Sequence, residues 1–225
     1  MAVITLASSK GGCGKSTTAI VLAGQFAEQG YRVRIIDADP KRRVVRWAAS
    51  GMVPETITVK AADHTSLATE VRNAELDNDV VLIDVEGSAN MVVSMAIGRS
   101  HYVAIPANPS AADVEDAIQM VGLVNDIPNN AGKPAVHAVL WTRVPTGFRS
   151  REFNALAKQL EEAGIPVCDV VLSERSAYKS LISYSTTLDR LPTDEVPSVD
   201  KARSEGRALA EAISAAILGA QEKAA

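Results

Sequence analysis

Several features that would reveal a protein class at once are missing from this chain of 225 residues. Its two cysteines, Cys13 and Cys168, lie far apart without a Cys-x-x-Cys pair, which argues against a disulfide framework, a zinc knuckle and an iron–sulfur site. No window approaches the roughly 20 apolar residues of a membrane span, and the opening apolar run is too short for a signal peptide. The histidines are scattered, and there is no Gly-x-Ser-x-Gly nucleophile elbow. These absences favour a cytoplasmic protein.

A strong charge of either sign is missing as well. The formal net charge is -4, so any contact with a polyanion has to come from a local patch rather than from the whole molecule. Hydrophobic residues make up 47% of the chain, which is enough to bury a full core as one domain. We expect residues 1–225 to form a single domain that ends in a helix at about 199–220.

Short β-branched runs alternate with longer helical stretches along the whole chain. This alternation is typical of a parallel sheet with crossover helices, and nearly continuous apolar strands indicate that helices cover both faces. The sequence therefore predicts an α/β fold, a three-layer sandwich with a mostly parallel sheet of about seven strands. The predicted strands are 3–7, 32–36, 57–59, 80–83, 102–105, 136–142 and 167–172. The predicted helices before the terminal one are 15–29, 65–76, 88–98, 111–126, 150–162 and 175–184.

A glycine-rich stretch, SSKGGCGKST, lies where the first strand ends and the first helix begins. Its glycines let the backbone turn tightly and direct N–H groups at phosphate oxygens, and the helix presents its positive end to the same anion. Lys15 would then pair with the β- and γ-phosphates, and the Ser16 hydroxyl would bind Mg²⁺. The predicted nucleotide-binding residues of this stretch are Gly11, Gly12, Cys13, Gly14, Lys15, Ser16 and Thr17.

The same stretch departs from the strict phosphate-loop pattern. That pattern, G-x-x-x-x-G-K-[ST], needs a glycine at position 9, whereas this chain has Ser9 followed by a second lysine, Lys10. A cation that reaches phosphates from outside the loop can neutralise charge on the leaving β–γ bridge, as an arginine finger does. Lys10 is therefore a candidate catalytic residue, with a solvated loop lysine as the alternative.

Carboxylates end two of the predicted strands. Asp37 and Asp39 follow the second strand, and Asp84 ends the fourth in the run VVLIDVEG. An aspartate after a strand is more often a helix cap, but the carboxyl ends of neighbouring parallel strands also bring such residues to one edge of the sheet, beside the glycine-rich turn. Gly87 can offer its N–H to the γ-phosphate and sense it. The predicted metal-site residues are Ser16, Asp37, Asp39 and Asp84.

Taken together, these motifs resemble those of the deviant Walker ATPases of the ParA/MinD superfamily. The resemblance rests on the stretch from Lys10 to Thr17, on the DADP sequence at 37–40, on the Asp84 strand and on IPA at 105–107. It is strong over about the first 110 residues and looser to about residue 185. Within the superfamily the chain resembles the short ParA partition proteins and the VirC-type proteins of conjugative transfer. The resemblance implies a P-loop NTPase fold and an ATPase that uses ATP and Mg²⁺.

The resemblance also implies roles for single residues. Lys10 corresponds to the signature lysine of the superfamily, which reaches ATP across the interface of a face-to-face homodimer. Asp39 would orient or activate the attacking water, so the implied catalytic residues are Lys10, Lys15 and Asp39. Glu86 stands in a segment where partition proteins commonly have Asp-Thr-Pro-Pro; it is either a second water-positioning group or a surface acid, and we favour the surface acid. Arg143 resembles the adenine-side position.

Partners follow from the same resemblance. Partition ATPases bind DNA without sequence preference as ATP-bound dimers, are stimulated by a DNA-bound, ParB-like centromere-binding protein, and associate with the nucleoid. The candidate DNA contacts are the basic residues of the later segments, Arg175, Lys179, Arg190, Lys201, Arg203 and Arg207. The early basic cluster at 41–46 directly follows the catalytic aspartates and is expected to serve the nucleotide side or the dimer edge.

Two alternatives stay open at this point. A MinD-like membrane-cycling ATPase would need a C-terminal amphipathic helix with bulky apolar residues and a basic flank. The last helix has a stripe of Leu209, Ile213 and Ile217 but a thin basic flank, so we expect it to pack on the sheet and expect no membrane partner. A VirC-like adaptor that recruits a partner and barely hydrolyses ATP is the other alternative.

Overall fold

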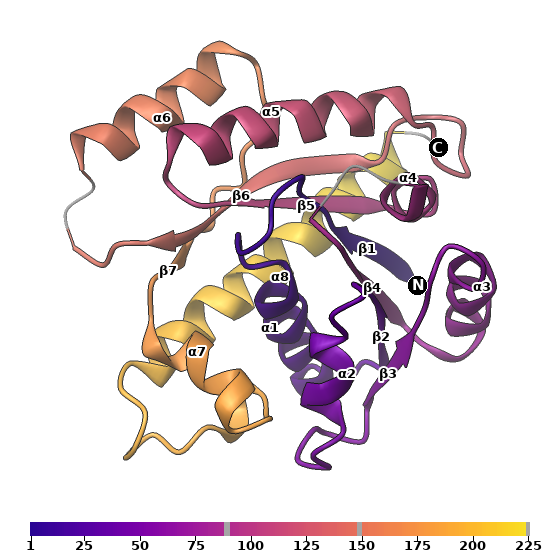
Figure 1. Cartoon of the computed structure of the whole chain (residues 1–225), viewed down its shortest axis with the longest axis vertical. Coiled ribbons are helices and arrows are strands. Elements are labelled where there is room, and N and C mark those ends of the chain that lie inside the picture. The colour runs from indigo at the N-terminus through magenta and orange to yellow at the C-terminus, as the bar shows by residue number, and fades with distance from the viewer. Residues whose placement is uncertain (88–90, 148–149, 224–225) are drawn as a thin grey trace.

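The structure, a computed structural model, describes residues 1–87, 91–147 and 150–223. Within these residues a seven-stranded sheet lies between two layers of helices (Figure 1). All of its strand pairs are parallel, in the order β3-β2-β4-β1-β5-β6-β7. The strands are β1 (Ala2–Leu6), β2 (Val33–Ala38), β3 (Ile57–Ala61), β4 (Val80–Val85), β5 (Tyr102–Ala107), β6 (Val136–Val144) and β7 (Leu172–Ser173). The predicted three-layer α/β fold is confirmed.

Eight α-helices and one 3₁₀ helix connect and cover the strands in the described part of the chain. They are α1 (Lys15–Glu28), α2 (Arg43–Ala48), α3 (Leu67–Asp77), α4 (Met91–Ile97), α5 (Ala111–Asp126), α6 (Arg151–Glu162), α7 (Ser176–Ser183), η1 (Leu188–Arg190) and α8 (Val199–Glu222). Successive side chains of a strand point to opposite faces of the sheet, so each strand contributes side chains to the packing against both helix layers. In β1, Ile4 and Leu6 pack with α1, α2, α7 and α8, whereas Val3 packs with α3, α4, α5 and α6.

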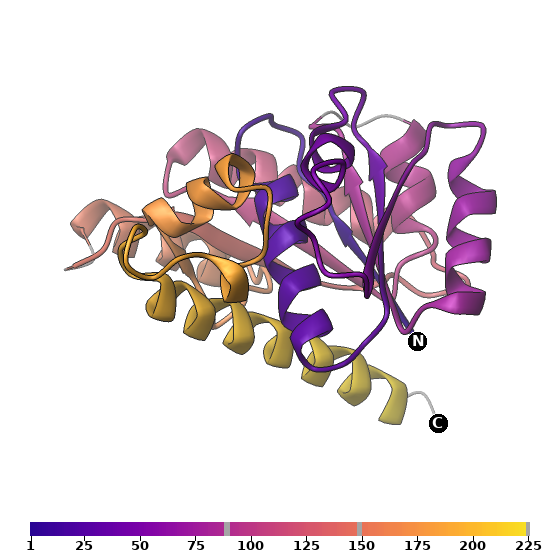
Figure 2. The same cartoon turned by 90° about the horizontal axis from the view of Figure 1, so that it is seen from below.

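The terminal helix α8 crosses one face of the molecule beside α1, as both views show (Figures 1 and 2). Its apolar stripe is buried, with Leu209 and Ile213 each 1% exposed and Ile217 7% exposed. The prediction that this helix packs on the rest of the fold is therefore confirmed. Among the described residues, none of the helices combines the length and the apolar character needed to cross a bilayer.

One predicted strand was wrong in part, and one helix was not predicted. The strand predicted at 167–172 is only Leu172–Ser173, because Val167 forms a single isolated bridge with Val139 and the chain then leaves the sheet. Helix α2 was not predicted at all. It begins because the Asp37 carboxylate accepts hydrogen bonds from the backbone N–H groups of Val44 and Val45, both at 3.0 Å. The first three residues of the helix predicted at 88–98 lie outside the described residues.

Candidate functional site

The candidate site lies at the carboxyl edge of the sheet, around the end of β1. This strand pairs with β4 on one side and with β5 on the other. The strand order reverses at this point, because the earlier strands lie on one side of β1 and the later strands on the other. Open parallel sheets bind ligands at such switch points, outside the carboxyl ends of the strands. The glycine-rich loop leaves β1 here and α1 begins at Lys15. Gly12 and Gly14 adopt φ angles of 88° and 101°, a left-handed conformation that explains why glycine occupies both positions.

Lys15 lies inside this loop, with only 6% of its surface exposed. Its ammonium group donates hydrogen bonds to the carbonyl oxygen of Lys10 at 2.8 Å and to Ser8 Oγ at 2.9 Å. The Cys13 side chain is buried beneath the loop, where its sulfur lies 2.8 Å from Ser8 Oγ. Cys13 is thus a small packing side chain under the loop, and only its backbone belongs to the loop surface.

A cavity of about 380 Å³ opens over this loop, and we name it the loop cavity. Its lining combines the loop and the start of α1 with residues that follow β2 and β4, with the start of α2 and with the end of β6. The lining residues are Gly11, Gly12, Gly14, Lys15, Ser16, Thr17, Asp39, Lys41, Arg43, Glu86, Gly87 and Arg143. The structure therefore brings together the glycine-rich loop, the predicted catalytic Asp39 and Arg143, which lie far apart in the sequence.

Asp84 is fully buried behind the loop cavity at the end of β4. Neither of its carboxylate oxygens has a hydrogen-bond partner among the described residues. Burial raises the pKa of Asp84 to about 7, and the charges of Asp37 and Asp39 act in the same direction, whereas the nearby Ser16 hydroxyl and Lys15 ammonium oppose it. Burying a carboxylate without hydrogen-bond partners costs free energy, and the oxygens of Asp84 are therefore available to a ligand.

The other two predicted aspartates have different surroundings. Asp37 is side by side with Asp84 in the sheet and is also fully buried, but its carboxylate is already used as the cap of α2. Burial raises the pKa of Asp37, and the N–H groups that it accepts from oppose that shift. Asp39 lies at the cavity wall, where it accepts a hydrogen bond from the Lys41 N–H at 2.8 Å. A metal role for Asp37 stays a prediction.

Lys10 extends away from the loop toward α5 of its own chain. Its ammonium group lies 3.8 Å from the Asp116 carboxylate, and the two side chains are 45% and 28% exposed. Ion pairs this exposed contribute at most about 1 kcal/mol, so Lys10 can leave Asp116 at little cost. Its backbone, by contrast, is fixed, because the Lys10 carbonyl oxygen also accepts hydrogen bonds from Ser8 Oγ and from Lys15 Nζ.

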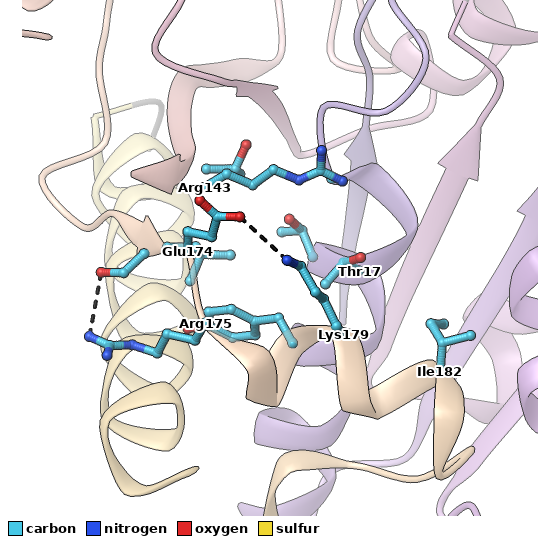
Figure 3. Close-up of a pocket in the computed structure, with 12 residues that line it drawn as sticks. Thr17, Arg143, Glu174, Arg175, Lys179 and Ile182 are labelled. Carbon is cyan, nitrogen blue, oxygen red and sulfur yellow. Dashed lines mark hydrogen bonds and ion pairs between the residues drawn. The ribbon is translucent and has the colours of Figure 1, made fainter. Parts of the chain in front are cut away.

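A second cavity of about 290 Å³ adjoins the loop cavity, and we name it the β7 cavity (Figure 3). The two cavities share Gly14, Thr17 and Arg143. Its wall is otherwise formed by the end of β6, by β7 and by α7, with apolar contributions from Leu172, Tyr178 and Ile182. A largely apolar pocket beside a phosphate-binding loop suits a flat ring system, whereas the loop cavity suits anionic groups.

A half-buried ionic network supports the wall of the β7 cavity. Glu205 of α8 accepts hydrogen bonds from the Arg175 guanidinium at 2.5 Å, from Ser173 Oγ at 2.7 Å and from the Tyr178 hydroxyl at 2.7 Å. Burial alone would raise the pKa of Glu205, but these hydrogen bonds outweigh it and hold the pKa below its ordinary value of 4.5. The network joins β7, α7 and α8.

Replacing Glu205 with glutamine is expected to lower the free energy of unfolding by about 1–3 kcal/mol at pH 7, because Arg175 loses its charged acceptor. A carboxylate whose pKa is depressed in the folded state stabilises it fully above the ordinary glutamate pKa of 4.5, and that contribution is lost as the pH falls through the folded pKa. Urea unfolding at pH 7 and at pH 4 or below would show the difference between wild type and variant shrinking in acid. Glu162→Gln, in the exposed pair with Lys158, is the control and should cost less than about 0.5 kcal/mol.

The basic residues proposed as DNA contacts are mostly held by partners within the chain. Arg175 binds Glu205, Lys179 pairs with Glu174 at 3.4 Å, and Arg207 pairs with Glu28 at 3.4 Å. Arg203 lies between Asp189 and Asp200, and Arg190 donates to the carbonyl oxygen of Met52. The pairs of Lys179 and Arg207 are exposed and can open at little cost, whereas Arg175 and Arg203 are half-buried. A DNA role for these five residues and for the exposed Lys201 stays a prediction.

Sequence reasoning missed three parts of this site. Gly87 packs directly against the loop, so close to Lys10 and Gly11 that it has no room for a side chain. Thr142 donates a hydrogen bond to the Cys13 carbonyl oxygen at 2.7 Å and thereby ties β6 to the loop. Asp116, which pairs with Lys10, lies on the exposed part of a helix and carries no motif. The glycine in VVLIDVEG was the one available signal for the packing of Gly87, and its predicted contact with the γ-phosphate stays a prediction.

Comparison with known proteins places this geometry in context. The sequence matches the CobQ/CobB/MinD/ParA nucleotide binding domain over residues 4–188. It is 35% identical to the protein ParA of Rhizobium radiobacter over 196 residues, which cover 87% of this chain and 88% of that protein. It is 29% identical to the protein virC1 of the same species over 187 residues, 80% of each chain.

A solved structure shares the fold. An ATP complex of Cyanothece McdA, in which an aspartate is replaced by alanine, aligns with a TM-score of 0.72 over 95% of this chain and 96% of that one, at 18% identity. At this identity the likeness shows the fold alone. The family match spans the glycine-rich loop, the three aspartates and Arg143, so the residues that line the two cavities fall inside the shared domain.

Proposed function

The chain belongs to the CobQ/CobB/MinD/ParA nucleotide-binding family, and we propose that it acts as a ParA-type partition ATPase that positions DNA. In this proposal it binds ATP with Mg²⁺, pairs with a second copy of itself, and separates after hydrolysis to ADP and phosphate. The observation that carries the proposal is the loop cavity, which the glycine-rich loop, Lys15 and Asp39 line together. Close to it, Asp84 has no hydrogen-bond partner for its carboxylate among the described residues.

The phosphates of ATP are proposed to occupy the loop cavity and the base the β7 cavity. Gly12 and Gly14, with left-handed φ angles, line the cavity, where their backbone N–H groups would donate to phosphate, and the N-terminus of α1 adds its positive dipole end. Lys15 supplies a buried positive charge at the base of the loop, where low exposure to water makes its attraction for phosphate strong. The wall of the β7 cavity around Thr142 and Leu172 would lie beside the base.

Magnesium fits the residues behind the loop. Asp84 has two buried oxygens without hydrogen-bond partners among the described residues, and the Ser16 hydroxyl lies close enough to lower its pKa. Oxygen donors of this kind suit Mg²⁺, which usually keeps several waters and takes one or two carboxylates plus phosphate. Ser16 and Asp84 would hold the ion, which when bound neutralises phosphate charge. Asp37, whose carboxylate caps α2, is a less direct candidate.

Asp39 is the proposed water-positioning residue. It lines the loop cavity together with the glycine-rich loop, and its carboxylate accepts a hydrogen bond from the Lys41 N–H. A residue that orients the attacking water needs only hydrogen-bond reach, and a fixed rotamer lowers the cost of holding that geometry. Lys10 is proposed to leave Asp116 and reach the ATP bound to the other copy of the chain.

Replacing Asp39 with alanine is expected to slow phosphate release at least about 100-fold while ATP binding and pairing persist, because binding rests on the loop rather than on Asp39. If partition is the function, the variant should also bind DNA of unrelated sequences in ATP, with an affinity that falls as salt rises, and should stay bound where wild type dissociates. Phosphate release and DNA binding with ATP, with ADP and without nucleotide measure both effects.

Two outcomes would count against this proposal. Normal turnover by Asp39→Ala would refute the catalytic assignment, and Glu86→Gln then tests whether the neighbouring acid of the cavity positions the water instead. DNA binding that ignores the nucleotide, or no DNA binding at all, would remove the partition function and leave the ATPase.

The second candidate is an adaptor that recruits a partner and barely hydrolyses ATP. The similarity to virC1 over 80% of this chain favours it. Turnover separates the two functions, because a partition ATPase is stimulated by DNA and a ParB-like protein, whereas an adaptor stays slow with either. A membrane-cycling function is not favoured, since the apolar stripe of α8 is buried against the fold.

A further inference from the structure

Strand β6 contains an irregularity at the point where it reaches the site. Thr142 pairs with Leu172 and Val144 pairs with Ser173, so Arg143 is an extra residue between two consecutive pairs of the ladder. Its φ angle is +53°, in the left-handed region that residues with a Cβ rarely adopt. Bulges of this kind re-aim a side chain and recur next to functional sites.

The residues on both sides of the bulge are fixed. Thr142 is 3% exposed and its hydroxyl donates to the Cys13 carbonyl oxygen at 2.7 Å, inside the glycine-rich loop. Val144 is 4% exposed and its carbonyl oxygen accepts the Glu174 N–H at 2.7 Å. With its two neighbours held inward, Arg143 is turned outward, and the bulge is tied to the loop by a direct hydrogen bond.

The Arg143 side chain lies at the boundary of the two cavities and lines both. Figure 3 shows it extending from the end of β6 across the top of the β7 cavity, with its guanidinium away from Lys179. Glu174 lines the β7 cavity too, yet it pairs with Lys179 at 3.4 Å. No hydrogen bond or ion pair joins the Arg143 guanidinium to any described residue.

We propose that Arg143 is a phosphate-binding residue, which contacts the nucleotide phosphates from within the same chain rather than the base. The proposal rests on the proposed nucleotide site and adds a third cation to Lys10 and Lys15. A guanidinium offers planar, paired donors that match phosphate oxygens. The guanidinium lies at the mouth of a cavity lined by the glycine-rich loop and Lys15, where it is placed to bind phosphate. Glu174, the carboxylate that lines the β7 cavity, pairs with Lys179.

Inorganic tripolyphosphate separates this proposal from base recognition, because it carries the phosphates without a base. Calorimetric titration with Mg²⁺ present would compare ATP and tripolyphosphate on wild type, Arg143→Gly and Arg143→Lys. Glycine accepts a φ of +53° without strain, so Arg143→Gly should keep the fold, and its melting temperature without ligand checks this. We expect Arg143→Gly to weaken both ligands about tenfold, and Arg143→Lys to weaken both by less. Lys158→Ala, on the distant helix α6, should change neither affinity.

Each outcome decides the question. If Arg143→Gly weakens ATP but binds tripolyphosphate as wild type does, Arg143 serves the base and the proposal is overturned. Unchanged affinity for both ligands also overturns it, because the arginine is then a solvated side chain. If wild type itself binds neither ligand, the proposed nucleotide site fails first, and that result is distinct from a defect confined to the Arg143 variants.

Discussion

Replacing Lys10 with alanine is expected to leave ATP bound but to abolish ATP-dependent pairing and to slow hydrolysis about 1,000-fold or more, the range of a lost arginine finger. The reason is that Lys10 is exposed and lies outside the loop cavity of its own chain, whereas Lys15 is buried within the loop. Lys15→Ala is the matched control, since it should lose ATP affinity itself. Light scattering measures the pairing, and phosphate release measures turnover.

Mixing two inactive variants tests where Lys10 acts. In a mixed pair of Lys10→Ala with Asp39→Ala, the subunit that keeps Asp39 can receive Lys10 from its partner, so one of its two sites is complete. Each mixed pair, whose amount light scattering measures, should then turn over at roughly half the rate of a wild-type pair, because one of its two sites is complete. If Lys10 acted within its own chain, no mixed pair would hold a complete site and the mixture would stay inactive. That result, or normal pairing of Lys10→Ala, would contradict the proposal that Lys10 reaches the ATP of the other copy.

The parts of this site that the sequence predicted are those whose chemistry is local. The glycine-rich loop is a continuous stretch between a strand and a helix, and Asp84 ends a run of buried apolar residues, so spacing along the chain was enough to place both. The three-layer fold followed for the same reason, because alternating strands and helices have few ways to pack.

The parts that it did not predict depend on contacts between distant segments. The bulge at Arg143 is held by the hydrogen bond from Thr142 to the Cys13 carbonyl oxygen, two residues that are 129 positions apart. No sequence pattern within β6 predicts this bulge. Helix α2 has only six residues, and its start depends on the buried Asp37 carboxylate rather than on a cap at its own N-terminus. The predicted strand at 167–172 has the right composition, but its residues leave the ladder with β6 between Cys168 and Leu172. Tertiary packing decides such elements.

Gly87→Ala is expected to disable the enzyme although Gly87 is only a backbone position. A Cβ there would lie 2.4 Å from the Lys10 carbonyl oxygen and 2.7 Å from the Gly11 nitrogen. Both are backbone atoms, so no side-chain rotation relieves the contact and the loop itself must move. The Lys10 carbonyl oxygen also accepts a hydrogen bond from the Lys15 ammonium group, so a displacement of the loop disturbs both Lys10 and Lys15. We expect turnover to fall about 100-fold, because displacements near 1 Å cost that much, and the free energy of unfolding to fall by about 1–3 kcal/mol.

Gly122→Ala provides the comparison for this effect. Gly122 lies within α5, and a Cβ built there meets nothing within 4 Å, so alanine should raise the free energy of unfolding by up to about 1 kcal/mol and leave turnover unchanged. Steady-state phosphate release and urea unfolding on both variants distinguish loop displacement from a general effect of a methyl group. If Gly87→Ala unfolds like wild type and hydrolyses ATP at the normal rate, the end of β4 does not hold the glycine-rich loop in place. The position of Lys10 would then depend on the hydrogen bonds that its carbonyl oxygen accepts from Ser8, Lys15 and Cys13.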